Sequence, residues 1–194
     1  MIHPKLRKGF PVVPRVKYLL RAPIVTQDTD YTCGVAALQS VLYFWDEDEE
    51  YFEPKLAKRL KANTKDGVVS AQIESFARNH DFKVDIKEGI ELEELKKYIR
   101  EGKPVIVLLQ AWRSSPRIKW SRWKDGHFAV VIGYDSRNIY FMDTSTVGNY
   151  TYIPTKEFID RWHDEDGGKK VKNFGIILWK GKRYFDDRIA VKMK

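Results

Sequence analysis

The first half of the chain carries apolar residues at helical spacing. Residues 33–45 form its most apolar run, with apolar side chains recurring at positions 35, 38, 41, 42 and 45, and this spacing predicts a buried helix. Either Asp30 or Thr32 is expected to cap that helix. Shorter amphipathic stretches predict three further helices, the second of them capped by Ser70, at 52–60, 70–77 and 91–99.

The second half of the chain changes to runs that are typical of β-strands. Residues 105–109 and 127–134 are almost continuously apolar, as expected for strands that are covered on both faces. The turn-forming residues 135–138 predict a hairpin into a strand over 139–143. Weaker strand patterns occur at 16–20, 82–86, 150–154 and 174–179. Helices followed by such a meander indicate an α+β protein, with N-terminal helices packed on an antiparallel sheet.

The remaining segments are predicted to be connections or chain ends. The acidic cluster 46–50 is expected to end the first helix, and Thr155 is expected to cap a last helix that ends at Trp162. Residues 167–170 are expected to form a loop. A length of 194 residues suits one domain. We therefore expect three parts: a basic N-terminal arm (1–22), one domain (23–180) and a basic C-terminal tail (181–194).

Composition excludes several classes of protein. The chain has no apolar run of membrane-spanning length and no apolar signal core near Met1, so neither a membrane span nor a signal peptide is expected. Its single cysteine excludes an internal disulfide and fits a reducing compartment, which makes the cytoplasm the expected location. The formal charge of +8 is compatible with nucleic acid, but we favour a solvated lysine-rich surface.

Cys33, the only cysteine, is a candidate nucleophile. It lies where a polar, turn-prone run gives way to the predicted helix, so it should occupy the first turn. There the backbone N–H groups and the partial positive charge of the helix start favour the thiolate, which is the nucleophilic form. Gln27, six residues upstream, could aim its amide N–H at the space in front of the sulfur. A lone cysteine is more often a small buried apolar residue, so the rest of the chain must decide.

A histidine and an aspartate in the second half complete a possible catalytic set. His127 begins one predicted strand, and Asp143 ends the strand that the hairpin joins to it. Antiparallel partners keep a nearly constant index sum, so residue 127 should lie opposite residue 143 or 144. A carboxylate beside an imidazole can fix its tautomer and stabilise the imidazolium, and the imidazole can deprotonate a thiol. The alternatives are a polar residue at a strand end and an aspartate that bonds its own turn.

No other group of residues supports a different chemistry. The remaining histidines are His3, in the arm, His80, in a turn, and His163, in a predicted loop; none has an evident partner. The chain has no CxxC or HExxH motif and no glycine-rich phosphate loop, so no metal or other cofactor is expected.

These residues together resemble the peptidase C39 family of papain-like cysteine peptidases. The resemblance extends over about 24–165, and each motif is weak singly but fairly specific in combination with the others. The motifs that carry it are Gln27 followed by Cys33-Gly34-Val35-Ala36-Ala37-Leu38, Gly126 to Asp135, Phe141-Met142-Asp143, Thr64 to Gly67, Gly102 to Val107, and Glu157 to Trp162.

The resemblance implies a papain-like (cysteine proteinase) fold and a role for each candidate. Cys33 would be the nucleophile, His127 the general base, Asp143 its orienter, and Gln27 an oxyanion donor beside the backbone N–H of Cys33. The best-known members process bacteriocin-type leader peptides after a Gly-Gly pair and are fused to ABC exporters. We expect a stand-alone form here, because the sequence has neither membrane segments nor a nucleotide-binding part. Thr32 stands where the family often has an acidic residue.

The segment 110–124 has no counterpart in the resemblance. It contains three tryptophans and five basic residues, and it leads directly into His127. Its tryptophans could form a lid or groove wall for an acidic or extended substrate, or they could stack on single-stranded nucleic acid. A surface loop whose tryptophans pack on the core is an equal alternative. The candidate substrate-binding residues are Trp112, Trp120 and Trp123.

The sequence therefore predicts a thiol hydrolase, most simply a cysteine peptidase acting on a peptide or protein substrate. Two alternatives stay open: a thiol-dependent acyl or peptidyl transferase, and a papain-like module that binds peptide or nucleic acid without turnover. Of these ligands, nucleic acid is disfavoured. The sequence does not indicate the cleaved bond or the oligomeric state.

Overall fold

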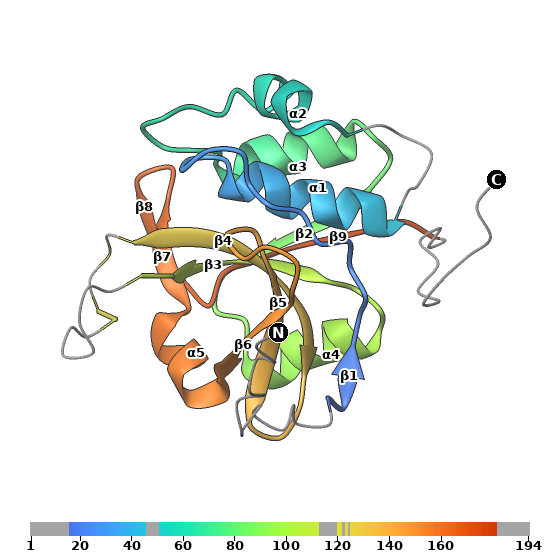
Figure 1. Ribbon diagram of the computed structural model, residues 1–194, viewed down its shortest axis with the longest axis vertical. Helices are drawn as coiled ribbons and strands as arrows, with labels where there is room; N and C mark the ends of the chain where they lie inside the picture. Colours follow the sequence, from blue (N-terminus) through green and yellow to red (C-terminus); the bar gives the residue numbers. More distant parts are fainter. Residues whose placement is uncertain (1–15, 46–50, 113–119, 122, 124, 182–194) are drawn as a thin grey trace, which may run out of the picture.

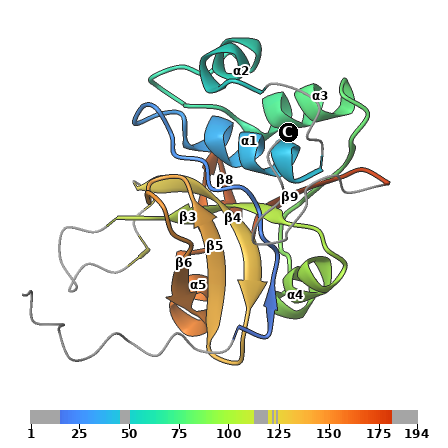
Figure 2. The ribbon, with the colours of Figure 1, turned by 45° about the vertical axis from the view of Figure 1, so that its right-hand side comes forward.

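The computed structural model describes residues 16–45, 51–112, 120–121, 123 and 125–181. Within these residues, a twisted β-sheet lies between two layers of helices (Figure 1). Helices α1 and α3 cover one face of the sheet and α2 packs on α1, whereas α4 and α5 cover the other face (Figure 2). The helices are α1 (Cys33–Trp45), α2 (Glu53–Arg59), α3 (Ser70–Arg78), α4 (Leu92–Arg100) and α5 (Thr155–Arg161).

The main sheet is antiparallel throughout. Its strands follow the order β2-β9-β3-β4-β5-β6, and β1 pairs with the far end of β4. A separate two-stranded sheet consists of β7 and β8. The strands are β1 (Tyr18–Leu19), β2 (Lys83–Lys87), β3 (Val105–Gln110), β4 (Gly126–Tyr134), β5 (Asn138–Asp143), β6 (Thr151–Pro154), β7 (His163–Asp166), β8 (Lys169–Lys172) and β9 (Gly175–Trp179).

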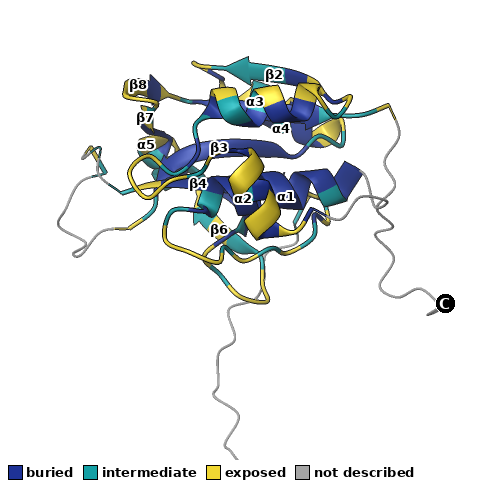
Figure 3. Ribbon diagram, turned by 90° about the horizontal axis from the view of Figure 1, so that it is seen from above, coloured by how far each residue is buried: buried dark blue, intermediate teal, exposed yellow. Residues whose placement is uncertain are grey.

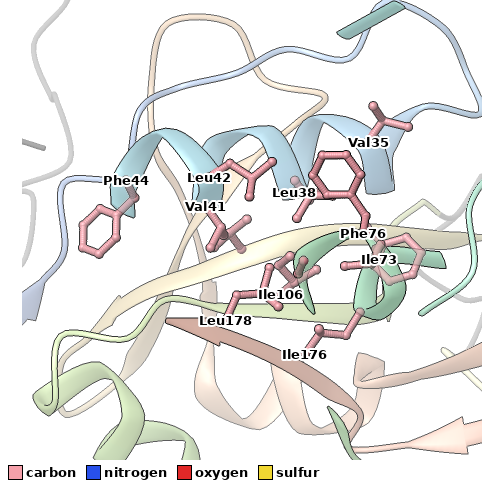
Figure 4. Packing of buried hydrophobic residues seen from close by; sticks show 14 of the residues in the cluster. Val35, Leu38, Val41, Leu42, Phe44, Ile73, Phe76, Ile106, Ile176 and Leu178 are labelled. Carbon is pink, nitrogen blue, oxygen red and sulfur yellow. The ribbon is translucent and has the colours of Figure 1, made fainter. Parts of the chain in front are cut away.

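Burial on both faces explains why the central strands are continuously apolar. In β3, Ile106 and Leu108 face the α1 side, whereas Val105, Val107 and Leu109 face the α4 side. The α1 side chains lie directly over the sheet beside those of α3 (Figure 4). From above, α1 is buried along its length, and α2 exposes one side to solvent (Figure 3). The start of α1 is therefore held against the central strands by the main core.

The predicted helices and strands are confirmed within one or two residues at their ends, but the three predicted caps are wrong. The Thr32 hydroxyl turns away from α1 and bonds the Thr29 carbonyl. Ser70 is the first helical residue of α3 rather than its cap, and its hydroxyl pairs with the Asp166 carboxylate. Thr155 likewise begins α5 without a side-chain cap. For Thr32 and Ser70, a side-chain partner that precedes the helix or is remote in the sequence competes with the local cap.

The sequence did not predict the β7–β8 hairpin. Residues 167–170 were expected to be a loop and His163 to lie in one, but Asp166 pairs with Lys169 across a two-residue turn. Gly167 and Gly168 both have positive φ, as a tight hairpin turn of the primed type requires. Charged residues dominate both strands, so no apolar alternation marks them.

Some expectations concern residues outside the described ranges. These are the acidic cluster 46–50, most of the N-terminal arm, and the tail from 182 onward. The limits of the expected domain therefore stay predictions. None of the helices in the described ranges combines the length and the apolar character that crossing a bilayer requires.

Candidate active site

Cys33 is the first residue of α1, as the sequence predicts, and its side chain is partly buried. Gly34 follows it because there is no room for a larger residue. A Cβ atom at Gly34 would lie 2.3 Å from Cγ1 of Val68 and 2.9 Å from Cδ2 of Phe128. The start of the helix is therefore packed tightly against Val68 and against Phe128, near the start of β4, and this packing fixes the position of the cysteine.

This close packing gives a prediction about stability. The change Gly34→Ala is expected to lower the free energy of unfolding by about 1–3 kcal/mol, because neither neighbour is the end of a long flexible side chain. Urea denaturation measures the loss. The matched control is Gly181→Ala, since a Cβ there meets nothing within 4 Å. Equal stability of the two variants would contradict the packing argument.

Gln27 lies in a hydrogen-bonded turn that leads to Cys33. Its side-chain Nε2 donates to the Thr29 carbonyl at 2.8 Å, and that carbonyl also accepts the Thr32 hydroxyl at 3.1 Å. Glu53 of α2 ties this turn to the helical layer, because its carboxylate accepts the Asp28 backbone N–H at 3.0 Å. One amide hydrogen of Gln27 is thus occupied, and the other has no acceptor among the residues that the structure describes.

His127 and Asp143 share a face of the sheet because β4 contains a bulge. The register between β4 and β5 shifts by one residue at Ile132. Asp143 therefore pairs with Ala129, two residues from His127, and side chains two residues apart point to the same side. Without the shift Asp143 would oppose Val130, and its side chain would point to the other face. The sequence-based expectation of direct opposition is wrong, but the predicted proximity is confirmed.

The two side chains form a direct hydrogen bond. Nε2 of His127 donates to Oδ1 of Asp143 at 2.8 Å, and the imidazole is almost completely buried. Asp143 also accepts the Ser145 backbone N–H at 3.1 Å and the Thr146 hydroxyl at 2.8 Å. It therefore bonds its own turn and orients the histidine at the same time.

The electrostatics of the pair favour an imidazolium beside a carboxylate. Burial disfavours the charged ring, but interactions with Asp143 and the Cys33 thiol outweigh burial and raise the pKa of His127 to about 9. Burial also opposes ionisation of Asp143, but hydrogen bonds from His127 and from the Ser145 backbone hold the pKa of Asp143 well below its usual range. The ring is thus charged at neutral pH.

The second ring nitrogen of His127 is the atom available to Cys33. Nε2 is engaged by Asp143, and the buried Nδ1 has no hydrogen bond of ordinary geometry among the described residues. The thiol nevertheless lies near enough to influence the pKa of the ring. Such contacts are often long without substrate and shorten when it binds. Nδ1 is therefore the ring atom through which His127 could exchange a proton with the sulfur once the contact shortens.

Two cavities flank Cys33 and His127. The larger, of about 380 Å³, is next to the sulfur and contains five carboxylates, those of Asp30, Asp66, Asp164, Glu165 and Asp166. Burial raises the pKa of Asp164 to about 6, although Gln110 donates to its carboxylate. The smaller cavity, of about 180 Å³, is lined by His127, Asp143, Trp112, Tyr152 and Arg161, among others. Cys33 lines only the larger cavity, and His127 lines only the smaller one.

The three candidate tryptophans occupy different places. Trp112 lines the smaller cavity and packs its ring on His127, with centroids 4.8 Å apart. Trp123 lines the larger cavity and packs on His163, with centroids 4.6 Å apart. Trp120 lies beneath the Arg161 guanidinium, at 4.3 Å, and lines neither cavity. The basic residues 113, 117, 119, 122 and 124 lie outside the described residues.

Sequence reasoning missed two supporting residues. Thr144, fully buried, donates its hydroxyl to Oε1 of Gln27 at 2.9 Å. Glu53 is buried beneath the turn that carries Gln27. An acidic residue at the start of a helix is ordinary, so the sequence carried no signal for Glu53. For Thr144 the only signal in the sequence was that it directly follows Asp143. Among the described residues, no group of three or more His, Cys, Asp or Glu side chains could hold a metal ion.

A scan against family models found one match. Residues 19–169 match the model described as the Peptidase C39-like family, which is more than half of the chain. A search of curated proteins found no match.

Solved structures of low sequence identity share the fold. A protein described as a C39-like peptidase from Bacillus anthracis is 19% identical, with a TM-score of 0.64 over 85% of this chain and 98% of that one. A double glycine motif protease from an AMS/PCAT transporter, in complex with the leader peptide, is also 19% identical, with a TM-score of 0.59 and coverages of 84% and 94%. The peptidase domain of Streptococcus ComA is 21% identical, with a TM-score of 0.57 and coverages of 80% and 96%.

Proposed function

Because this chain belongs to the peptidase C39-like family, we propose that it is a cysteine peptidase that cleaves peptide bonds through an acyl-enzyme on Cys33. One observation carries the proposal. His127 bonds Asp143 through one ring nitrogen, and its pKa is raised by Asp143 and by the nearby Cys33 thiol. An imidazolium that is oriented by a carboxylate and lies beside a sulfur is the arrangement that thiol catalysis requires.

The proposed reaction has two stages. The Cys33 thiolate attacks the scissile carbonyl carbon and forms a first tetrahedral intermediate, whose oxygen is an oxyanion. His127 gives its Nδ1 proton to the amine as the C–N bond breaks, which leaves a thioester on the sulfur. His127 then takes a proton from a water molecule that attacks the thioester. Collapse of this second intermediate releases the carboxylic acid and restores the thiolate and the imidazolium.

We assign the oxyanion to two donors, the Cys33 backbone N–H and the free amide hydrogen of Gln27. The change Gln27→Ala is expected to lower kcat by about 10²–10³-fold, because an oxyanion donor acts on charge that develops only in the transition state. Steady-state hydrolysis of a peptidyl thioester measures the effect. The control is the alkylation rate of Cys33 by iodoacetamide, which involves no oxyanion and should stay unchanged. A loss in both assays would contradict this role.

We propose a peptide or protein substrate. One solved relative is in complex with a leader peptide, and the two cavities here could hold chain on either side of the scissile bond. Trp112 and Trp123 each line one of these cavities, so they are the tryptophans that we expect to contact substrate. Trp120 would support the smaller cavity indirectly, through Arg161, which lines that cavity. The Arg161 guanidinium also donates to the Gln110 and Ala111 carbonyls.

The proposal is tested by mass spectrometry of the intact protein. Exposure to a peptidyl chloromethyl ketone should add one peptide mass, and fragmentation should locate it on Cys33. In a separate assay, the unlabelled protein should hydrolyse a peptidyl thioester and release the free acid in the absence of an added amine. Release only when an amine acceptor is present would indicate a transferase instead, and absence of both labelling and product would indicate a binding module.

A nucleophilic thiol must stay reduced, and the chain has only one cysteine. We therefore propose the cytoplasm as its location. Fractionation of the source cells followed by immunodetection tests this directly.

A further inference from the structure

We propose that Thr144 is a positioning residue for the reaction, because it holds the Gln27 carboxamide with its N–H groups turned toward the turn that leads to Cys33. The inference rests on the proposed function. It assigns a role to a residue that belongs to neither the nucleophile nor the histidine–carboxylate pair.

Two hydrogen bonds join Thr144 to Gln27. The Thr144 carbonyl accepts the Gln27 backbone N–H at 2.9 Å, and the Thr144 hydroxyl donates to Oε1 of Gln27 at 2.9 Å. Residues that are 117 positions apart in the sequence are therefore fixed at both backbone and side chain. Thr144 has no exposed surface, so its hydroxyl is shielded from water, whereas Gln27 is partly exposed.

The direction of the amide follows from the contacts at its two ends. The Thr29 carbonyl can only accept, so the end of the carboxamide that faces it must be Nε2. Oε1 is then the end that faces Thr144, and the Thr144 hydroxyl donates to it and holds it in place. The opposite end, Nε2, donates one hydrogen to the Thr29 carbonyl at 2.8 Å. Its second hydrogen is the one that we assign to the oxyanion. If the amide rotated by half a turn, an oxygen would replace that donor and would repel the developing negative charge.

A competing role for Thr144 would act through the histidine. Its Oγ1 lies 3.5 Å from Nε2 of His127 and 3.4 Å from the Phe128 carbonyl. The hydroxyl has a single proton, however, and the contact with Gln27 is the shortest of the three. Nε2 of His127 already directs its hydrogen to Asp143 at 2.8 Å. These distances favour Gln27 as the group on which Thr144 acts.

The test compares Thr144→Val, which removes the hydroxyl at nearly constant shape, with Thr144→Ser, which retains it. Two probes separate the possible roles. A peptidyl aldehyde forms a hemithioacetal on Cys33, whose oxygen occupies the oxyanion site, whereas iodoacetamide alkylates the sulfur without forming an oxyanion. Thr144→Val should weaken aldehyde affinity about 10-fold, the effect of one hydrogen bond, and leave the alkylation rate unchanged. Thr144→Ser should bind the aldehyde about as the unmodified protein does.

A double-mutant cycle completes the test. In a Gln27→Ala background, Thr144→Val should change aldehyde affinity less than about 2-fold, because the group through which it acts is absent. Unchanged affinity in the Thr144→Val single variant, a parallel loss of alkylation, or full additivity with Gln27→Ala would each overturn the inference. Failure of the proposed function is distinguishable, since the unmodified protein would then bind no aldehyde at all.

Discussion

The change Cys33→Ala is expected to abolish turnover of a peptidyl thioester, with a loss of about 10⁶-fold in kcat. No other cysteine exists in the chain to take over the attack on the carbonyl carbon. The remaining groups, His127 and Gln27, can polarise a carbonyl or activate water only weakly without the nucleophile. Product formation measured by liquid chromatography and mass spectrometry detects this loss.

The same change should leave the fold intact. The Cys33 side chain is only partly buried at the edge of the main core, and alanine is a good helix former. Coincident urea transitions for Cys33→Ala and the unmodified protein are the control. Residual hydrolysis above a few per cent, in a folded and pure Cys33→Ala preparation, would show that the sulfur is not the nucleophile.

The pattern of apolar residues predicted most of the fold. The helical spacing of residues 33–45 and the continuous apolar runs at 105–109 and 127–134 correspond to α1, β3 and β4. In these elements the apolar pattern follows directly from burial. The helix α1 packs on one face of the sheet, and β3 is covered on both faces. The expected α+β, papain-like fold is confirmed by the solved C39-like structures.

The pattern could not give the exact register or the polar contacts. A bulge at Ile132 shifts the pairing by one residue, yet an isoleucine within a run of apolar residues carries no sign of it. The partners of Ser70 and Thr144 depend on which segments the fold brings together, since they lie 96 and 117 residues away in the sequence. Sequence spacing therefore indicated Cys33, His127 and Asp143, but not the residues that support them.

The second large effect on activity is expected at His127. The change His127→Ala is expected to lower kcat/KM by about 10⁴–10⁶-fold, because the same ring gives a proton to the amine and takes one from water. Alkylation of Cys33 by iodoacetamide at pH 7 should slow at least about 10-fold, since the imidazolium beside the sulfur no longer favours the thiolate. Unchanged alkylation in a folded His127→Ala protein would contradict the ion-pair argument.

The pH profile tests the same ring without removing it. The pKa of His127 is raised to about 9 from a usual value near 6.5, so the imidazolium is retained throughout this interval and is lost only as pH rises through about 9. Activity should therefore fall on the basic side near pH 9. The change Asp143→Asn removes a cause of the raised pKa, so the basic limb should move to lower pH. The change Asp160→Asn, at an exposed residue of α5 that does not contribute to this pKa, should leave the limb in place. If the limb stayed near pH 9 in Asp143→Asn, the carboxylate would not be what keeps His127 charged.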